Sequence, residues 1–154
     1  MLEVDLSDDY ANAKYISNAK SFPEKWQKKA TNFRNERAFF STVELDIPYG
    51  PSDREKMDIF YPKKGTTGVF VFIHGGYWRA FDKSTWSHLS LGALDNGFVS
   101  VIPSYRLCPE VSIAQITLDI AKCIIAIANI VDSGPIVLAG HSAGGHLVSR
   151  MLCG

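Results

Sequence analysis

The chain has 154 residues, of which 46% are hydrophobic and 21% are charged, and 16 basic side chains balance 16 acidic ones. This composition is ordinary for a globular protein, and the length suffices for one domain with a hydrophobic core. A net charge of zero gives no indication of nucleic acid or an anionic membrane as a partner. The acidic start MLEVDLSDDY is unlike a signal peptide, and no apolar run approaches the length that spans a membrane.

The chain has three cysteines, Cys108, Cys123 and Cys153, and no pair of them has the spacing of metal ligands. We therefore expect free thiols in a reducing compartment, which predicts a cytoplasmic protein. No metal ion or organic cofactor is expected, because His, Asp and Glu do not cluster at ligand spacing and the Gly-Gly pairs form no phosphate loop.

Residues 1–40 are more polar and basic than the rest, and we interpret them as a helical segment that packs on the domain or covers its site. Residues 41–154 are interpreted as part of a single domain. The sequence Ser-Phe-Pro-Glu at 21–24 predicts a capping box that opens a helix. Helical spacing places Trp26 and Phe33 on the face toward the domain. The basic residues of this helix that lie mostly off that face are expected to be solvated: Lys25, Lys28, Lys29 and Arg34.

Alternating apolar residues predict two antiparallel, half-buried strands, at 43–47 and at 57–61. Three nearly continuous apolar runs follow, at 68–73, 98–102 and 135–139. Such runs are typical of strands that are covered on both faces, as in a parallel sheet between helices.

Helices are expected between these runs. One is capped by Asp82 and ends near Gly97, and a longer one is capped by Ser112 and ends at Gly134. The alternation of strands and helices predicts an α/β fold with right-handed crossovers.

The sequence Gly140-His-Ser-Ala-Gly144 follows the last apolar run and fits the pattern G-x-S-x-G. A strand that turns sharply into a helix holds the serine hydroxyl clear of the sheet, which makes Ser142 a candidate nucleophile. The Ala143 amide then lies at a helix N-terminus, where it can stabilise an oxyanion. In the alternative interpretation Ser142 only caps the helix, although capping does not require flanking glycines.

A second motif, His74-Gly-Gly-Tyr-Trp78, ends another apolar run. An oxyanion needs two or more N–H donors, and we expect the amides of Gly76 and Tyr77 to supply them. His74 is interpreted as a hydrogen-bonding strut of this loop rather than as a base. Trp78 is a candidate substrate-binding residue, with core packing as the alternative.

Together the two motifs resemble the α/β-hydrolase superfamily, in its branch with an H-G-G oxyanion loop. HGGYW and GHSAGGHL are similar to the kynurenine formamidase (arylformamidase) family, and YGPSDREKMDIFYP and SYRLCPE agree with this. Cys108 stands where that pattern has alanine. The resemblance implies an α/β-hydrolase fold, a mostly parallel sheet with helices on both faces, and an ester or aryl formamide as substrate.

In this superfamily a carboxylate and then a histidine follow the serine along the chain. After Ser142 the sequence has no Asp or Glu, and its one histidine there, His146, lies a helical turn away on a helix that leaves the site. His141 is expected against the pocket wall, and His88 on a surface helix. We therefore expect these residues to be the N-terminal portion of a longer enzyme, with C-terminal strands and helices missing, or else a truncated, inactive product.

The sequence thus predicts a serine hydrolase that works through an acyl-enzyme on Ser142. Tyr77 and Trp78 suit an aryl ring, and Tyr10 or Tyr15 could fold over it. Two alternatives stay open: a carboxylesterase for short acyl groups, and an inactive α/β-hydrolase domain that binds a ligand or protein. The expected partner is a small ester or amide, not nucleic acid or a membrane, and a homodimer is left open.

Overall fold

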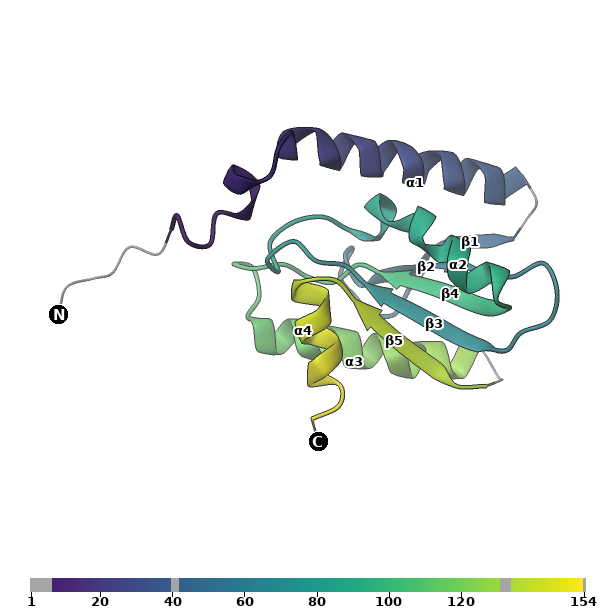
Figure 1. Cartoon of the computed structure of the whole chain (residues 1–154). Helices are drawn as coiled ribbons and strands as arrows, with labels where there is room; N and C mark the ends of the chain where they lie inside the picture. The colour runs from purple at the N-terminus through teal and green to yellow at the C-terminus, as the bar shows by residue number, and fades with distance from the viewer. Residues whose placement is uncertain (1–6, 40–41, 131–133, 154) are drawn as a thin grey trace.

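The computed structural model describes residues 7–39, 42–130 and 134–153. Its centre is a five-stranded sheet in the order β1-β2-β4-β3-β5 (Figure 1). The pairs β1/β2 and β2/β4 are antiparallel, whereas β3 runs parallel to both β4 and β5. Two antiparallel strands followed by a parallel sheet agree with the prediction, but the second of them is not half-buried as predicted, because residues 57–60 are buried on both of its faces. The strands are β1 (Val43–Pro48), β2 (Lys56–Phe60), β3 (Gly68–Ile73), β4 (Phe98–Pro103) and β5 (Ile136–Gly140).

Helices cover both faces of this sheet, which confirms the predicted α/β class. In Figure 1, α1 and α2 lie on one face and α3 and α4 lie on the other. The helices are α1 (Phe22–Phe39), α2 (Leu91–Asp95), α3 (Ile113–Ile130) and α4 (Ala143–Arg150). Four short 3₁₀ turns complete the described elements: η1 (Asn12–Tyr15), η2 (Ala19–Ser21), η3 (Lys83–Thr85) and η4 (Ser87–Ser90).

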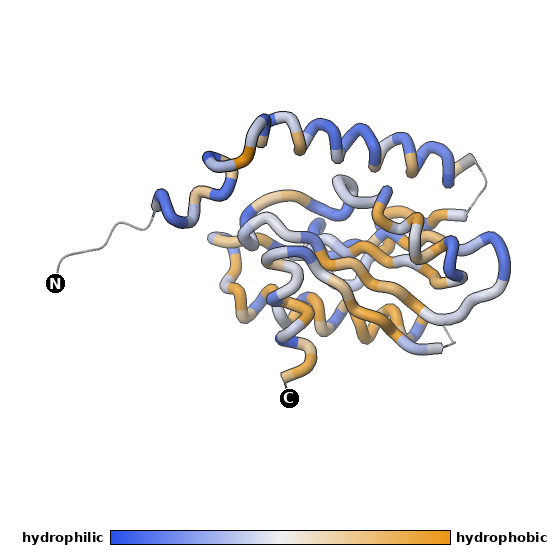
Figure 2. The backbone as a smooth tube through the Cα atoms, in the orientation of Figure 1, coloured by the Kyte–Doolittle hydropathy of each residue, from blue (hydrophilic) through white to orange (hydrophobic). Residues whose placement is uncertain are grey.

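Each face of the sheet has its own cluster of buried apolar side chains. The cluster under α3 and α4 includes Val71, Val101, Ile120, Ile127 and Leu147. The cluster under α1 and α2 includes Phe33, Phe60, Trp86, Leu94 and Ile102. Because β3 and β4 contribute to both clusters, they need apolar residues at nearly every position, and Figure 2 shows the sheet mostly in the orange of hydrophobic residues. In contrast, β5 packs on the first cluster only, through Ile136 and Leu138.

The α3 helix begins with the capping arrangement that Ser112 predicted. The Gln115 amide donates to the Ser112 hydroxyl (3.3 Å), and the Ser112 amide donates to the Gln115 side chain (2.9 Å). The described helix ends at Ile130, and residues 131–133 of the predicted span lie outside the described residues.

The length and hydropathy of α3 correct one statement made from the sequence. Among the described residues, α3 is the one helix that is long and apolar enough to cross a membrane by length and composition. Here one side of it packs on the sheet, where Ile116, Ile120 and Ile127 are buried. Leu118 and Ile125 on its other side are more than 60% exposed.

The prediction of a single helix after Asp82 is wrong. Asp82 does cap a turn, because its carboxylate accepts the Ser84 amide at 2.7 Å. That turn is η3, however, and η4 and the five-residue α2 follow it, up to Asn96. His88 consequently lies half-buried in η4 rather than on a surface helix, and burial lowers the pKa of its imidazole.

The α1 helix packs on the η3–η4 region and on β2 through its aromatic residues. Trp26 lies 4.9 Å from Trp86 and Phe33 lies 5.3 Å from Phe60, measured between ring centroids. Arg34 is not on a solvated face as predicted, since its guanidinium donates to the Ser84 carbonyl and, at 2.7 Å, to the Ser87 hydroxyl. At the start of the helix, α1 begins at Phe22 as expected, but the predicted capping box of Ser21 with Glu24 is wrong. Both the amide and the hydroxyl of Ser21 donate instead to the Asn18 carbonyl, each at 2.9 Å.

Candidate active site

The two motifs lie side by side because β3 and β5 are parallel neighbours that end at the same edge of the sheet. Ile73, the last residue of β3, is in register with Gly140, the last of β5. Beyond the strands, the His141 amide donates to the Ile73 carbonyl at 3.2 Å. A Cβ placed on Gly75 would lie 3.1 Å from the Ser142 Cβ, so the loop after β3 contacts the serine directly.

Ser142 adopts a strained backbone conformation between β5 and α4. Its φ is 54° and its ψ is −119°, in a region that non-glycine residues rarely enter. Although Ser142 precedes the first residue of α4, its side chain makes no capping hydrogen bond, and the residue is exposed. The interpretation of Ser142 as a simple helix cap therefore lacks its defining contact.

The glycines of G-x-S-x-G are required by close approaches of the backbone. A Cβ on Gly140 would lie 2.6 Å from the Gly145 nitrogen, and a Cβ on Gly144 would lie 2.7 Å from the His74 carbonyl oxygen. Real Cβ atoms do not approach the backbone so closely. The sharp turn from β5 into α4 can therefore form only with glycine at both positions.

The loop after β3 also turns sharply. Gly76, Tyr77 and Trp78 all have positive φ, at 113°, 51° and 56°. Among the residues that the structure describes, the amides of Gly76, Tyr77 and Ala143 donate no hydrogen bond to the protein. The three amides predicted as oxyanion donors thus belong to the loop whose Gly75 lies against Ser142 and to the residue that follows the serine.

His74 lies where it can support the loop after β3 by packing and hydrogen bonding. Its ring is fully buried, stacks on Tyr105 with centroids 4.3 Å apart, and places Nδ1 2.7 Å from the Gly75 carbonyl oxygen. The Tyr105 hydroxyl donates to the His74 carbonyl at 2.7 Å. Burial lowers the pKa of the His74 imidazole to about 4, so the ring is neutral at physiological pH and suited to holding the loop.

Trp78 packs mainly against the core. It is half-buried beside the cluster under α3 and α4, and its ring lies edge-on to His146 at 5.3 Å. The Trp78 carbonyl accepts the Cys108 amide at 2.8 Å. The more exposed side chain of this loop is Tyr77, whose hydroxyl donates to the carbonyl of Tyr10 (3.0 Å) and so connects the N-terminal segment to the site.

A general base for Ser142 is not found within the ranges 7–39, 42–130 and 134–153. No histidine in them hydrogen-bonds the serine hydroxyl, and the rings of His141 and His146 lie beside Trp86 and Trp78. The same ranges contain no group of three or more His, Cys, Asp or Glu residues arranged to hold a metal ion.

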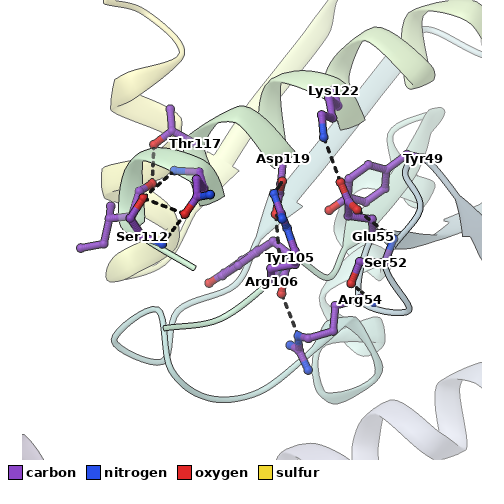
Figure 3. A network of polar contacts seen from close by, with 12 residues as sticks. Tyr49, Ser52, Arg54, Glu55, Tyr105, Arg106, Ser112, Thr117, Asp119 and Lys122 are labelled. Carbon is purple, nitrogen blue, oxygen red and sulfur yellow. Dashed lines mark hydrogen bonds and ion pairs between the residues drawn. The ribbon is translucent and has the colours of Figure 1, made fainter. Parts of the chain in front are cut away.

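Two residues of the site were missed from the sequence, Tyr105 and Arg54. Tyr105 follows β4 and holds His74, and Arg54 precedes β2 and donates to the Tyr105 carbonyl at 2.8 Å (Figure 3). Both belong to stretches that carry the family resemblance, SYRLCPE and YGPSDREKMDIFYP, and that was the signal available for them.

Comparison with known proteins places the chain in a family. The sequence profile of the BD-FAE family matches residues 57–153, which is more than half of the chain. The chain belongs to the BD-FAE family. The matched BD-FAE region includes β2 to β5 and both motifs of the candidate site.

Curated relatives of this BD-FAE chain include kynurenine formamidases and methylesterases. It is 31% identical over 114 residues to kynurenine formamidase from Danio rerio, which covers 70% of this chain and 38% of that protein. It is 32% identical over 111 residues to kynurenine formamidase from Drosophila melanogaster, and this match covers 69% of this chain and 37% of that protein. It is 30% identical over 122 residues to isoprenylcysteine alpha-carbonyl methylesterase from Arabidopsis thaliana, and this match covers 74% of this chain and 29% of that protein. The chain thus spans less than two fifths of the length of these relatives.

Solved structures agree with this placement. A crystal structure from Silicibacter sp., named provisionally as a thioesterase, is 51% identical, with a TM-score of 0.93 over 97% of this chain and 56% of that one. Esterase B from Lactobacillus rhamnosis is 24% identical, with a TM-score of 0.64 over 84% of this chain and 48% of that one. The fold is that of the α/β-hydrolases, as the resemblance implied.

Proposed function

We propose that the encoded protein is a serine hydrolase that cleaves a carboxylic ester or an aryl formamide through an acyl-enzyme on Ser142. The observation that carries the proposal is the exposed, strained Ser142, set against the Gly75 backbone and beside three unpaired amides. Strain at a residue that makes no structural hydrogen bond is typical of functional sites.

In the proposed reaction the Ser142 Oγ attacks the substrate carbonyl carbon and its proton passes to a general base. The carbonyl oxygen becomes an oxyanion, which the amides of Gly76, Tyr77 and Ala143 stabilise. Collapse of this intermediate expels the amine or alcohol, and water then releases the acyl group from the serine. The base and its orienting carboxylate are not assigned to any residue of this chain.

The names of the relatives support a substrate with an acyl carbonyl that carries a leaving group. A formamide, a methyl ester and a thioester share a carbonyl carbon with a leaving group, and one nucleophile and one oxyanion site can serve all three. Within this class we infer an aryl formamide, because kynurenine formamidases match the chain and the exposed Tyr77 ring, in the loop after β3, offers an aromatic surface for an aryl group. The methylesterase relatives favour a carboxylesterase as the second candidate.

A fluorophosphonate probe tests the nucleophile on the protein at its full encoded length. We expect labelling of Ser142, and we expect Ser142→Ala to abolish labelling and to lower turnover by at least ~10³-fold. If Ser142 stays unlabelled while the protein is folded, the protein is a binding domain of the same fold and the hydrolase proposal is wrong.

A comparison of substrates tests the acyl class. We expect a higher kcat/KM for N-formyl-kynurenine than for a p-nitrophenyl ester of a short acid. A large preference for the ester, with Ser142 still labelled, would retain the serine hydrolase and replace the formamidase by the carboxylesterase.

A further inference from the structure

Arg54 joins the two loops that surround the candidate site. It lies in the turn between β1 and β2, and its guanidinium donates to two backbone carbonyls from different loops. Nε donates to Tyr105, after β4, at 2.8 Å, and Nη2 donates to Phe81, after β3, at 2.6 Å. Figure 3 shows the side chain reaching Tyr105 from the turn. One side chain therefore bridges segments 27 and 51 residues away along the chain.

The first route from Arg54 to the nucleophile passes through Tyr105. With its carbonyl held by Arg54, Tyr105 stacks on His74 and donates its hydroxyl to the His74 carbonyl. His74 in turn contacts the Gly75 carbonyl through Nδ1. Gly75 lies against Ser142, so this route ends at the nucleophile after four contacts.

The second route passes through Phe81 to the proposed oxyanion donors. The Gly76 carbonyl accepts the amides of Arg79 (2.9 Å) and Ala80 (3.0 Å), which closes the loop into a tight turn. A Cβ on Gly76 would lie 2.8 Å from the Phe81 Cδ2, so the Phe81 ring packs directly on Gly76. Phe81 itself has a φ of 70°, a conformation that its surroundings must hold in place.

We propose that Arg54 is a positioning residue that fixes both ends of the 74–81 loop and thereby aims the Gly76 and Tyr77 amides at the reacting carbonyl. This inference rests on the proposed hydrolase function. Oxyanion stabilisation depends on donors that are already in place when the charge develops, so a small displacement of the loop weakens the transition state more than substrate binding.

The chemistry of the contact requires arginine. A planar guanidinium presents several N–H donors in fixed directions, so it can serve two carbonyls at once. A lysine at this position keeps the charge but supplies a single ammonium on a flexible stem. Arg54→Lys therefore separates the effect of the bridge from the effect of the charge.

Arg34 offers a matched control. Its guanidinium also donates to a backbone carbonyl, that of Ser84, and to the Ser87 hydroxyl. Those partners lie in η3 and η4, beyond the 74–81 loop. Arg34→Met removes a comparable set of contacts outside the loop and leaves the two routes described above intact.

The test measures kinetics and amide exchange on the protein at its full encoded length. We expect Arg54→Met and Arg54→Lys to lower kcat by ~10- to ~100-fold, with KM within ~2-fold of the wild type. Affinity for a trifluoromethyl ketone, which forms an oxyanion on the serine, should fall by the same factor as kcat/KM. Arg34→Met should leave kcat and this affinity unchanged.

Hydrogen–deuterium exchange gives a readout that does not depend on turnover. We expect faster exchange of the amides in 74–81 in both Arg54 variants and not in Arg34→Met. If the wild type neither labels nor turns over, the proposed function fails while exchange still decides whether Arg54 holds the loop. Unchanged exchange and kcat in the Arg54 variants, or equal losses in Arg54→Met and Arg34→Met, would overturn the positioning role.

Discussion

His74 has an imidazole that is fully buried, and its burial has a consequence for stability in acid. Desolvation lowers the pKa of the folded side chain from 6.5 to about 4, against the smaller opposing effects of the Gly75 carbonyl and Asp82, while the Arg54 charge adds to the lowering. At pH values between these two pKa values, the imidazole of the unfolded chain binds a proton that the buried imidazole of the folded chain does not. The contribution of the neutral His74 ring to the free energy of unfolding should therefore be complete above pH ~6.5. It should decrease by up to ~3 kcal/mol as the pH drops to 4.

Urea denaturation at a series of pH values between 4 and 8 measures this loss. We expect His74→Asn to flatten the profile in that window, although the variant starts from a lower stability. His146→Asn removes an exposed histidine and should retain the slope of the wild type. A His74→Asn profile as steep as that of the wild type would show that other groups cause the acid loss.

At the scale of the elements, the position of α4 depends on how closely its first turn approaches the end of β3. The Gly144 Cα faces the carbonyls of Ile73 and His74, and an added methyl group would lie 2.7 Å from the His74 oxygen. We expect Gly144→Ala to displace α4 and to lower the free energy of unfolding by ~3 kcal/mol or more, because backbone cannot yield as a flexible side chain can. Thermal and urea denaturation measure the change.

Gly92 is the matched control, because it is also a helical glycine but has open space where a Cβ would lie. Gly92→Ala should leave the stability unchanged or raise it by up to ~1 kcal/mol through the better helix propensity of alanine. Equal effects of the two substitutions would mean that the approach of α4 to β3 does not limit the fold.

The elements also show why the sequence predicted some features and not others. The apolar runs of β3, β4 and β5 have a local signature, and so does the glycine-flanked Ser142. The region after Asp82 has no such signature, since η3 and η4 pack on α1 and α2 packs on β4, and apolar spacing does not encode these contacts. Arg54 and Arg34 were missed for a related reason. Their partners are backbone carbonyls 27 to 51 residues away, and a carbonyl has the same chemistry at every position.

At the scale of the whole molecule, β5 ends the sheet in the part of the chain that the structure describes. It pairs with β3 on one side, and its exposed Val137 is 42% accessible. An apolar edge strand with unpaired N–H and C=O groups is a template for pairing with another chain, and a lysine there opposes such pairing. We therefore expect the purified 154-residue chain to self-associate with rising concentration, through the β5 edge.

Light scattering coupled to size-exclusion chromatography measures this association. Val137→Lys should lower the average mass toward that of a monomer, because the charge would be brought against a neighbouring strand. Leu118→Lys places the same charge on the outer side of α3, at a residue that is 61% exposed, and should leave the association intact. If Leu118→Lys dissociates the assembly and Val137→Lys does not, the contact is made by the apolar helix face, and the sheet edge is not the surface through which copies of this chain meet.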